Sequence, residues 1–183
     1  MTLNMFDKIK DFFRKRKLSK YACTEPTGFM PLSQISSANI VIDVEEPGFD
    51  KLKEEILSWG RASGVKLNIY FLDLRRLSKE ELLLTSIQTT ILKKELDWIG
   101  YPDITKLSGL TEERCDLFLS MVDSACPAID FISKCANARF KIGRRTYEGH
   151  SFDMVFSGNQ TEDLRSDAIL IFKTMIDFLS KIQ

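Results

Sequence analysis

Residues 40–72, IVIDVEEPGFDKLKEEILSWGRASGVKLNIYFL, contain the alternation that decides the fold. Residues 40–44 are a run of mostly β-branched side chains, which is typical of a strand covered on both faces. Residues 49–62 place apolar side chains at helical spacing, and Gly64 is suited to ending this helix. A second strand is predicted over residues 65–72. Strand, helix and strand in so short a stretch predict a parallel βαβ unit with a right-handed crossover.

The rest of the chain repeats this alternation. After a capping box at residues 78–81, the sequence predicts a short helix through 84, strands over 85–92 and 115–121, a helix over 127–135, short strands over 139–142 and 152–157, and a helix from about 161 to 182. This order predicts a single Rossmann-like α/β domain, with a mostly parallel sheet and helices on its faces. We expect one continuous core that includes Ile42, Ile56, Leu67, Leu119, Ile132, Val155, Phe172 and Met175.

The N-terminal segment differs in character from this domain. Residues 1–20 hold seven of the 26 basic residues and two of the 26 acidic ones, so the segment carries +5 and the remainder −5. Its apolar side chains fall in one arc of a helical wheel: Met5, Phe6, Ile9, Phe12 and Phe13. We expect a basic amphipathic helix over 1–18, a linker rich in Pro, Gly and Ser over 19–37, and the α/β domain over 38–183.

The aromatic side chains of this helix are unfavourable in water, so we expect a surface to cover them. We expect the helix to dock on its own domain, to contact a second subunit or a partner protein, or to attach to an anionic surface such as a membrane or nucleic acid. Docking or self-association is the favoured interpretation, and no specific nucleic-acid site is predicted. No apolar run approaches the roughly 20 residues of a membrane span, and no secretory signal is recognisable. A cytoplasmic location is therefore expected.

Motifs of the well-marked enzyme classes are absent from the sequence. It has no Gly-rich phosphate-binding loop, no zinc-protease motif and no Gly-x-Ser-x-Gly motif. His150 is the only histidine and the four cysteines are scattered, so neither a cofactor nor a metal site is predicted. Cys126 is either a nucleophile activated by the start of the following helix or an unreactive buried residue. The absence of a recognisable general base favours the second interpretation.

Four polar residues lie where open α/β sheets bind ligands. Asp43, Asp73 and Asp123 are at or near the carboxyl ends of predicted strands, and Ser124 follows in the turn to the next helix. Such a group would suit a divalent ion or a ribose hydroxyl. Aspartates also form turns and cap helices at these places, and this structural interpretation is favoured.

Basic residues gather around Gly143. Arg139 and Lys141 share one face of a predicted strand, and Arg144 and Arg145 follow the glycine. Paired N–H donors of this kind can grip a phosphate or a carboxylate, so this segment is a candidate site for an anionic small molecule. A charged, solvated hairpin would have the same sequence, and it is the favoured interpretation.

Segments spread over nearly the whole chain resemble those of a known family. They are the basic, Phe-rich start, NIVID at 39–43, LDWIGYP at 96–102, CDLF at 115–118 and ARFKIG at 138–143. With them the chain resembles an uncharacterised bacterial family, defined only as a domain of unknown function, which implies a compact intracellular domain without a particular activity. Residues 115–143 also resemble part of the N-terminal half of heptosyltransferase-type glycosyltransferases. Those enzymes hold a sugar nucleotide between two Rossmann-like halves, whereas this chain has room for one.

Two functions are consistent with these observations. The favoured one is a noncatalytic binding or interaction domain that recognises an anionic ligand or partner. The alternative is a small enzyme of the transferase or hydrolase type that acts on a nucleotide or a phosphorylated substrate. A pocket with convergent acids beside Arg144 would favour the enzyme.

Overall fold

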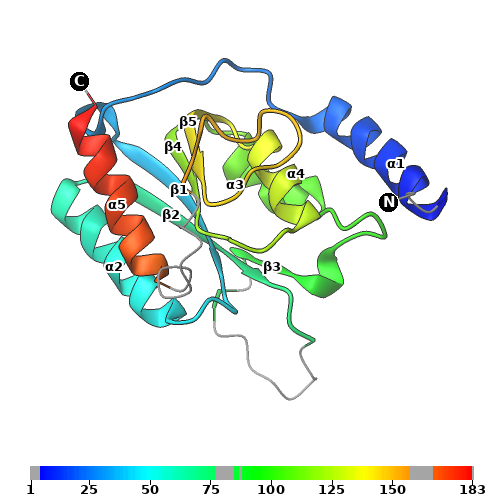
Figure 1. The fold of residues 1–183 in the computed structure, drawn as a ribbon, viewed down its shortest axis with the longest axis horizontal. Helices are drawn as coiled ribbons and strands as arrows, with labels where there is room; N and C mark the ends of the chain where they lie inside the picture. Colours follow the sequence, from blue (N-terminus) through cyan, green and yellow to red (C-terminus); the bar gives the residue numbers. More distant parts are fainter. Residues whose placement is uncertain (1–4, 77–84, 87, 157–166, 183) are drawn as a thin grey trace.

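The computed structural model describes residues 5–76, 85–86, 88–156 and 167–182 (Figure 1). In this part of the chain six strands form one sheet in the order β3-β2-β1-β4-β5-β6, and all neighbouring pairs are parallel. The strands are β1 (Ser37–Asp43), β2 (Lys66–Asp73), β3 (Thr90–Leu92), β4 (Cys115–Ser120), β5 (Ala138–Gly143) and β6 (Met154–Val155). The predicted α/β fold is confirmed, and the strand order is that of Rossmann-type sheets.

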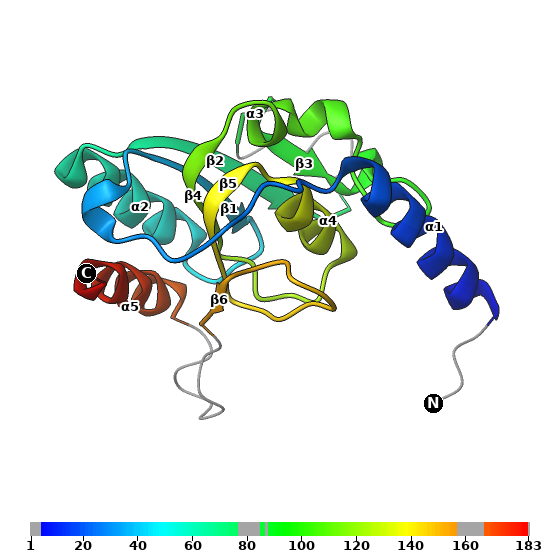
Figure 2. The same ribbon diagram turned by 90° about the horizontal axis from the view of Figure 1, so that it is seen from above.

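Helices cover both faces of this sheet (Figures 1 and 2). The α-helices are α1 (Met5–Tyr21), α2 (Phe49–Ser63), α3 (Ser108–Thr111), α4 (Pro127–Cys135) and α5 (Ala168–Lys181), and the 3-10 helices are η1 (Leu32–Gln34), η2 (Lys93–Glu95) and η3 (Ile104–Leu107). Buried side chains of α2 and α5 pack on one face, and those of α3 and α4 pack on the other. The molecule therefore has three layers.

The βαβ unit expected at the start of the domain is present. β1 and β2 pair in parallel, with Ile40 opposite Ile69. Between them, α2 buries apolar side chains that the helical spacing had singled out, among them Leu52 and Ile56. Gly64 ends the helix with a φ of 71°, a left-handed conformation that glycine adopts without strain.

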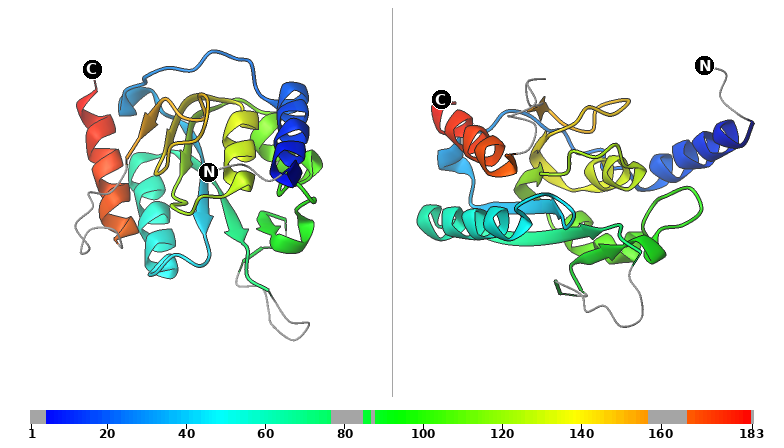
Figure 3. Two further views of the ribbon diagram at one scale, coloured as in Figure 1. Left: turned by 45° about the vertical axis from the view of Figure 1, so that its right-hand side comes forward. Right: turned by 60° about the horizontal axis from the view of Figure 1, so that its bottom comes forward.

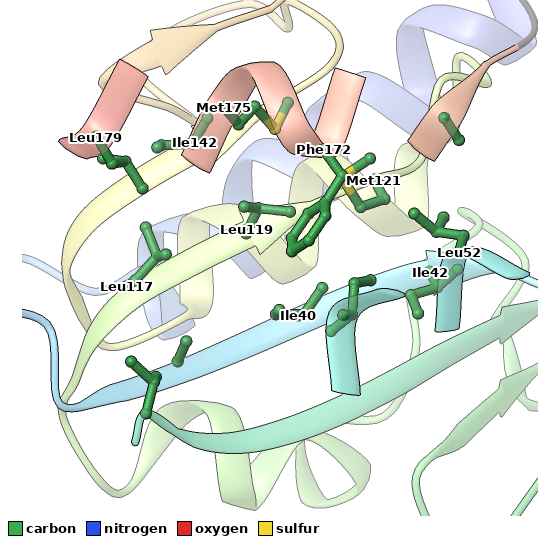
Figure 4. Close-up of a cluster of buried hydrophobic side chains, with 14 of the residues drawn as sticks. Ile40, Ile42, Leu52, Leu117, Leu119, Met121, Ile142, Phe172, Met175 and Leu179 are labelled. Carbon is green, nitrogen blue, oxygen red and sulfur yellow. The ribbon is translucent and has the colours of Figure 1, made fainter. Parts of the chain in front are cut away.

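The buried side chains form two clusters, one on each face of the sheet, so the expectation of one continuous core is wrong. Of the eight residues expected in the core, Ile42, Ile56, Leu119, Phe172 and Met175 are buried in the cluster beside α2 and α5, and Ile132 is buried in the other cluster. Figure 4 shows Phe172 of α5 directed toward the sheet. The last two, Leu67 and Val155, are only partly buried. Successive side chains of a strand point to opposite faces, so a sheet covered on both sides has two buried layers.

Three element boundaries differ from those expected. The strand predicted over 152–157 is β6, which spans only Met154–Val155 among the described residues. The strand predicted over 85–92 is reduced to β3, because the Thr89 N–H bonds to the Ser86 carbonyl and closes a turn before it. The last helix was expected to begin near 161, but α5 begins at Ala168. The Asp167 carboxylate caps this helix by accepting hydrogen bonds from two N–H groups of its first turn. The short helix predicted over 78–84 and residues 161–166 lie outside the described residues.

Residues 22–36 connect α1 to β1 along the side of the domain. The Cys23 N–H bonds to the Lys134 carbonyl, and the Gly28 N–H bonds to the Arg139 carbonyl, both at 2.9 Å. Met30 and Ile35 are buried in the cluster beside α2 and α5. This segment is therefore packed against the domain, whereas α1 projects from it (Figure 3).

The strand order places a topological switch point between β1 and β4. These strands are neighbours, but β1 leads to β2 on one side, and β4 leads to β5 on the other. Their carboxyl ends meet where open α/β sheets usually bind ligands. The candidate site begins there.

Candidate functional site

The carboxyl ends of β1, β4 and β5 bring together four of the eight predicted site residues. Asp43 ends β1, Asp123 and Ser124 follow β4, and Arg144 follows β5. Glu46, from the loop between β1 and α2, joins them through an ion pair with Arg144. We call these five residues the switch-point cluster.

Arg144 is the centre of the switch-point cluster. Its side chain is 1% exposed, and its Nη1 lies 3.1 Å from Glu46 Oε2 and donates to the Met121 carbonyl at 3.0 Å. Its Nη2 lies 3.5 Å from Asp123 Oδ2. Its Nε is buried and has no hydrogen-bond partner in the described part of the chain. The guanidinium therefore links the segments that follow β1, β4 and β5. Carboxylates occupy positions beside it that a bound anion would need.

Burial makes two acids of the cluster, Asp43 and Glu46, weaker than usual. It raises the pKa of Asp43, and the Ser124 hydroxyl and the Glu45 N–H, which both bond to this carboxylate, only partly oppose the rise. Burial also raises the pKa of Glu46 against the opposing effect of Arg144. Two carboxylates, those of Glu46 and Asp123, already pair with the one Arg144 guanidinium, an arrangement that disfavours phosphate.

Asp73, at the end of the neighbouring strand β2, forms its own ion pair, and its charge contributes to the raised pKa of Asp43. Its side chain is 1% exposed, and both of its oxygens accept hydrogen bonds from the Arg75 guanidinium, at 2.7 and 2.8 Å. These bonds hold the pKa of Asp73 below its ordinary value. In the part of the chain that the structure describes, no group of three or more His, Cys, Asp or Glu side chains is placed to hold a metal ion.

The four basic residues around Gly143 do not form one group. β5 is an interior strand between β4 and β6, so the expected hairpin is wrong. Arg139 lies near the start of β5 and pairs with Asp116, whereas Arg144 is buried past the end of the strand. Lys141 is buried on the opposite face from Phe140 and Ile142, as predicted, and Arg145 is exposed and donates to the Asp123 carbonyl.

Cys126 has the environment of an unreactive thiol. Burial raises its pKa, and the N–H groups of Ala128 and Ile129 at the start of α4 oppose this only in part. A thiol whose pKa is raised forms little thiolate at neutral pH. The environment therefore favours the buried, unreactive alternative.

A second candidate site is the outward face of α1. Of the nine exposed large apolar side chains among the described residues, five lie on this helix: Met5, Phe6, Ile9, Phe12 and Phe13. Trp98, from the loop after η2, contacts Phe6 and Phe13 and is itself 54% exposed. We call these six residues the apolar face. The sequence revealed the helical arc, but Trp98 was missed because only the fold brings it beside α1.

The second half of α1 attaches the helix to the domain. Arg14 Nε donates to the Ile99 carbonyl at 2.9 Å, and Lys17 pairs with Asp97 at 2.8 Å. Leu18 and Tyr21 pack against the cluster beside α4. Figures 2 and 3 show the first half of the helix extending away from the domain. None of the described helices has the length and apolar character that crossing a bilayer requires.

Comparison with known families supports the resemblance seen in the sequence. The model of a family of unknown function, DUF6913, matches residues 8–174, which include most of α1 and all six strands. No curated protein and no solved structure matches the chain. The similarity of residues 115–143 to heptosyltransferases thus has no support from these comparisons. The chain belongs to DUF6913, a family of unknown function.

Proposed function

We propose that this protein is a noncatalytic binding domain that attaches to an anionic membrane surface through the apolar face of α1. The observation that carries this proposal is the exposure of that face, with Phe12 at 62% and Met5 at 76%. Moving one such side chain out of water is favourable by about 2 kcal/mol. Because Arg14 and Lys17 hold the helix on the domain, the face has a fixed outward direction.

The charges around the apolar face favour an anionic surface. Helix α1 carries Lys8, Lys10, Arg14, Lys15, Arg16, Lys17 and Lys20 against Asp7 and Asp11. Lys8, Lys15, Arg16 and Lys20 are exposed beside the apolar arc or in line with it. Near an anionic leaflet each such cation contributes about 1 kcal/mol. The remainder of the chain carries −5, so the charges also favour an orientation with α1 toward the lipid.

A second copy of the chain fits the same face less well. Arg16 and Lys20 continue the line of the apolar arc toward the end of α1. Pairing two such faces in parallel would bring these cations close to those of the other copy, and like charges repel. Antiparallel pairing would place them on the apolar side chains of the other copy, where they lose water. A bilayer instead accepts apolar side chains and places phosphates beside the flanking cations.

We place this surface in the cytoplasm. The cytoplasmic leaflet is the anionic one, and all four cysteines are free thiols, which suits a reducing compartment. The alternative of an enzyme acting on a phosphorylated substrate is less favoured, because carboxylates surround Arg144 in the switch-point cluster.

Vesicle sedimentation of the full chain tests the proposal. We expect binding to vesicles of phosphatidylglycerol and phosphatidylcholine, little binding to phosphatidylcholine alone, and a loss of affinity as salt is raised. Phe12→Ser should weaken binding roughly tenfold or more, because it removes one apolar side chain from the membrane contact. Among the aromatic rings described, Phe12 contacts only Phe13, so the fold should tolerate this change. The matched control is Leu170→Ser, at a 44% exposed position of α5, which should bind as the native chain does.

Charge is tested by a second pair of variants. Lys8→Gln with Lys15→Gln should weaken binding, whereas Lys51→Gln with Lys66→Gln, at exposed positions outside α1, should leave it unchanged. Equal binding to neutral and anionic vesicles would contradict the proposal. So would a stable dimer in light scattering that Phe12→Ser dissociates, because the apolar face would then be a subunit interface.

A further inference from the structure

A cavity of about 350 Å³ lies between the segment that follows α1, the end of α4 and the connection from β5 to β6. Its lining includes Cys23, Lys134, Lys141, His150 and Asp153. The segment over the cavity is held by the bond from the Cys23 N–H to the Lys134 carbonyl and by the Thr27 hydroxyl, which bonds to Asp153. The walls therefore come from parts of the chain that are fixed to one another.

Lys141 is the unusual residue of this cavity, because it is a buried cation without a carboxylate partner. The residue is 6% exposed, and its Nζ donates to the Ser133 carbonyl at 2.8 Å. In the part of the chain that the structure describes, no carboxylate lies within ion-pair distance of this Nζ. A lysine ammonium has three N–H donors, and the Ser133 carbonyl takes one of them.

The acids and bases around Lys141 are already engaged. Asp153 accepts the Lys141 backbone N–H through one oxygen and the Thr27 hydroxyl through the other. Lys134 pairs with Asp130 at 2.8 Å and donates to the Glu148 carbonyl. Burial lowers the pKa of Lys141, as expected for a cation whose charge is poorly compensated. Among the described residues the Lys141 ammonium thus has no carboxylate in direct contact, and the Asp153 carboxylate opposes the lowered pKa only from a distance.

We propose that this cavity binds a small organic monocarboxylate whose carboxylate pairs with the Lys141 ammonium. The Lys141 Nζ donates to the Ser133 carbonyl and has further N–H donors for one carboxylate. The Glu25 and Asp153 carboxylates, which also line the cavity, disfavour a dianion such as phosphate. Cys23 and Phe152 offer apolar surface to the remainder of the ligand, and the volume lies in the range of small-molecule sites. This site is independent of the apolar face of α1.

Nuclear magnetic resonance of the full chain, with ¹³C in the lysine side chains, tests this proposal. Acetate, butyrate and benzoate are titrated against inorganic phosphate at matched ionic strength. We expect the carboxylates to shift the Lys141 Cε resonance saturably and to raise the pKa of Lys141, because a bound anion stabilises the ammonium. Phosphate should give neither effect. A saturable shift with phosphate, or no saturation with any carboxylate, would overturn the proposal.

Two variants identify the responsible cation. Lys141→Met should abolish carboxylate binding, and Arg145→Ala, which removes an exposed cation outside the cavity, should retain it. Reductive methylation of the native chain provides a measurement that does not depend on the folding of a variant. Butyrate should protect Lys141 and leave the exposed Lys51 reactive in mass spectrometry. Unaltered methylation of Lys141 at saturating butyrate, or full binding by Lys141→Met, would contradict the site.

Discussion

The ring of Phe13 in α1 meets the ring of Trp98 edge to face, with 5.2 Å between their centroids. Phe6 approaches the same indole at 6.5 Å. Trp98 remains 54% exposed although it contacts both rings, so the three side chains form one continuous surface across two segments of the chain. The contact, together with the bonds of Arg14 and Lys17, fixes the direction in which the apolar face points.

Deleting residues 1–17 should leave the domain folded. No residue of α1 is buried, so the deletion removes the Arg14 and Lys17 contacts without opening either core cluster. Circular dichroism of the shortened chain should show a cooperative thermal transition, with a midpoint only a few degrees lower. An unfolded or insoluble product would mean that α1 is part of the core.

Replacing Arg144 should be strongly destabilising. Arg144→Met leaves the Glu46 carboxylate, whose side chain is 10% exposed, without its partner, which should lower the free energy of unfolding by about 3–5 kcal/mol. Adding Glu46→Gln should recover part of this loss in urea denaturation. Arg145→Ala, at an exposed position, should change stability by less than about 0.5 kcal/mol. Equal losses of unfolding free energy in Arg144→Met and Arg145→Ala would show that the buried guanidinium does not stabilise the fold.

The two aspartates at neighbouring strand ends should give opposite pH dependences. The folded-state pKa of Asp43 is raised above its ordinary value of 3.8, so its contribution to stability is present below that pH and is lost as pH rises through the raised value. Asp43→Asn should therefore become more stable relative to the native chain as pH rises to neutrality.

For Asp73 the sign is reversed. Its pKa is lowered, so its contribution is present above the ordinary value and is lost as pH falls through the lowered one. Asp73→Asn should be most destabilised at neutral pH, and the difference should shrink in acid. Urea denaturation of both variants from pH 7 to about pH 3 checks this pair. The same slope for both variants would contradict the assigned environments.

Gly143 should not accept a side chain. A Cβ at this position would lie 2.6 Å from the Phe152 ring, which is closer than carbon atoms can approach, so Gly143→Ala should lower the free energy of unfolding by about 1–3 kcal/mol. Gly28→Ala is the matched control, because a Cβ there has nothing within 4 Å. A neutral Gly143→Ala would show that the connection from β5 to β6 moves easily.

Sequence patterns predicted the strands of the sheet better than they predicted the side-chain contacts at the carboxyl ends of those strands. Parallel strands align their carboxyl ends, so Asp43, Asp123 and Ser124 could be grouped by position alone. The basic residues could not be grouped in this way, because a strand rises ~3.3 Å per residue and separates Arg139 from Arg144 by about 17 Å. The pairing of Arg144 with Glu46 depends on how the β1–α2 loop folds over the sheet, which no local pattern encodes.

For the N-terminal helix, too, the sequence predicted the local structure but not the contacts with the rest of the domain. Its apolar arc follows from spacing in the sequence, and α1 spans Met5–Tyr21, close to the expected 1–18. The direction of that arc depends on contacts with residues 97–99, which are distant in the chain. Local sequence patterns also could not predict the burial of Lys141. This side chain lines a cavity only because residues 22–27 pack over its strand.

The depth of Trp98 in a bilayer tests the central claim most directly. The chain has two tryptophans, so the measurement uses Trp59→Phe, which retains an aromatic ring against Phe172 and leaves Trp98 as the only tryptophan. Anionic vesicles should shift its fluorescence to shorter wavelength, and brominated lipids should quench it; both effects should be absent with neutral vesicles and strongly reduced by Phe12→Ser. An emission of Trp98 that anionic vesicles neither shift nor quench would contradict attachment through α1.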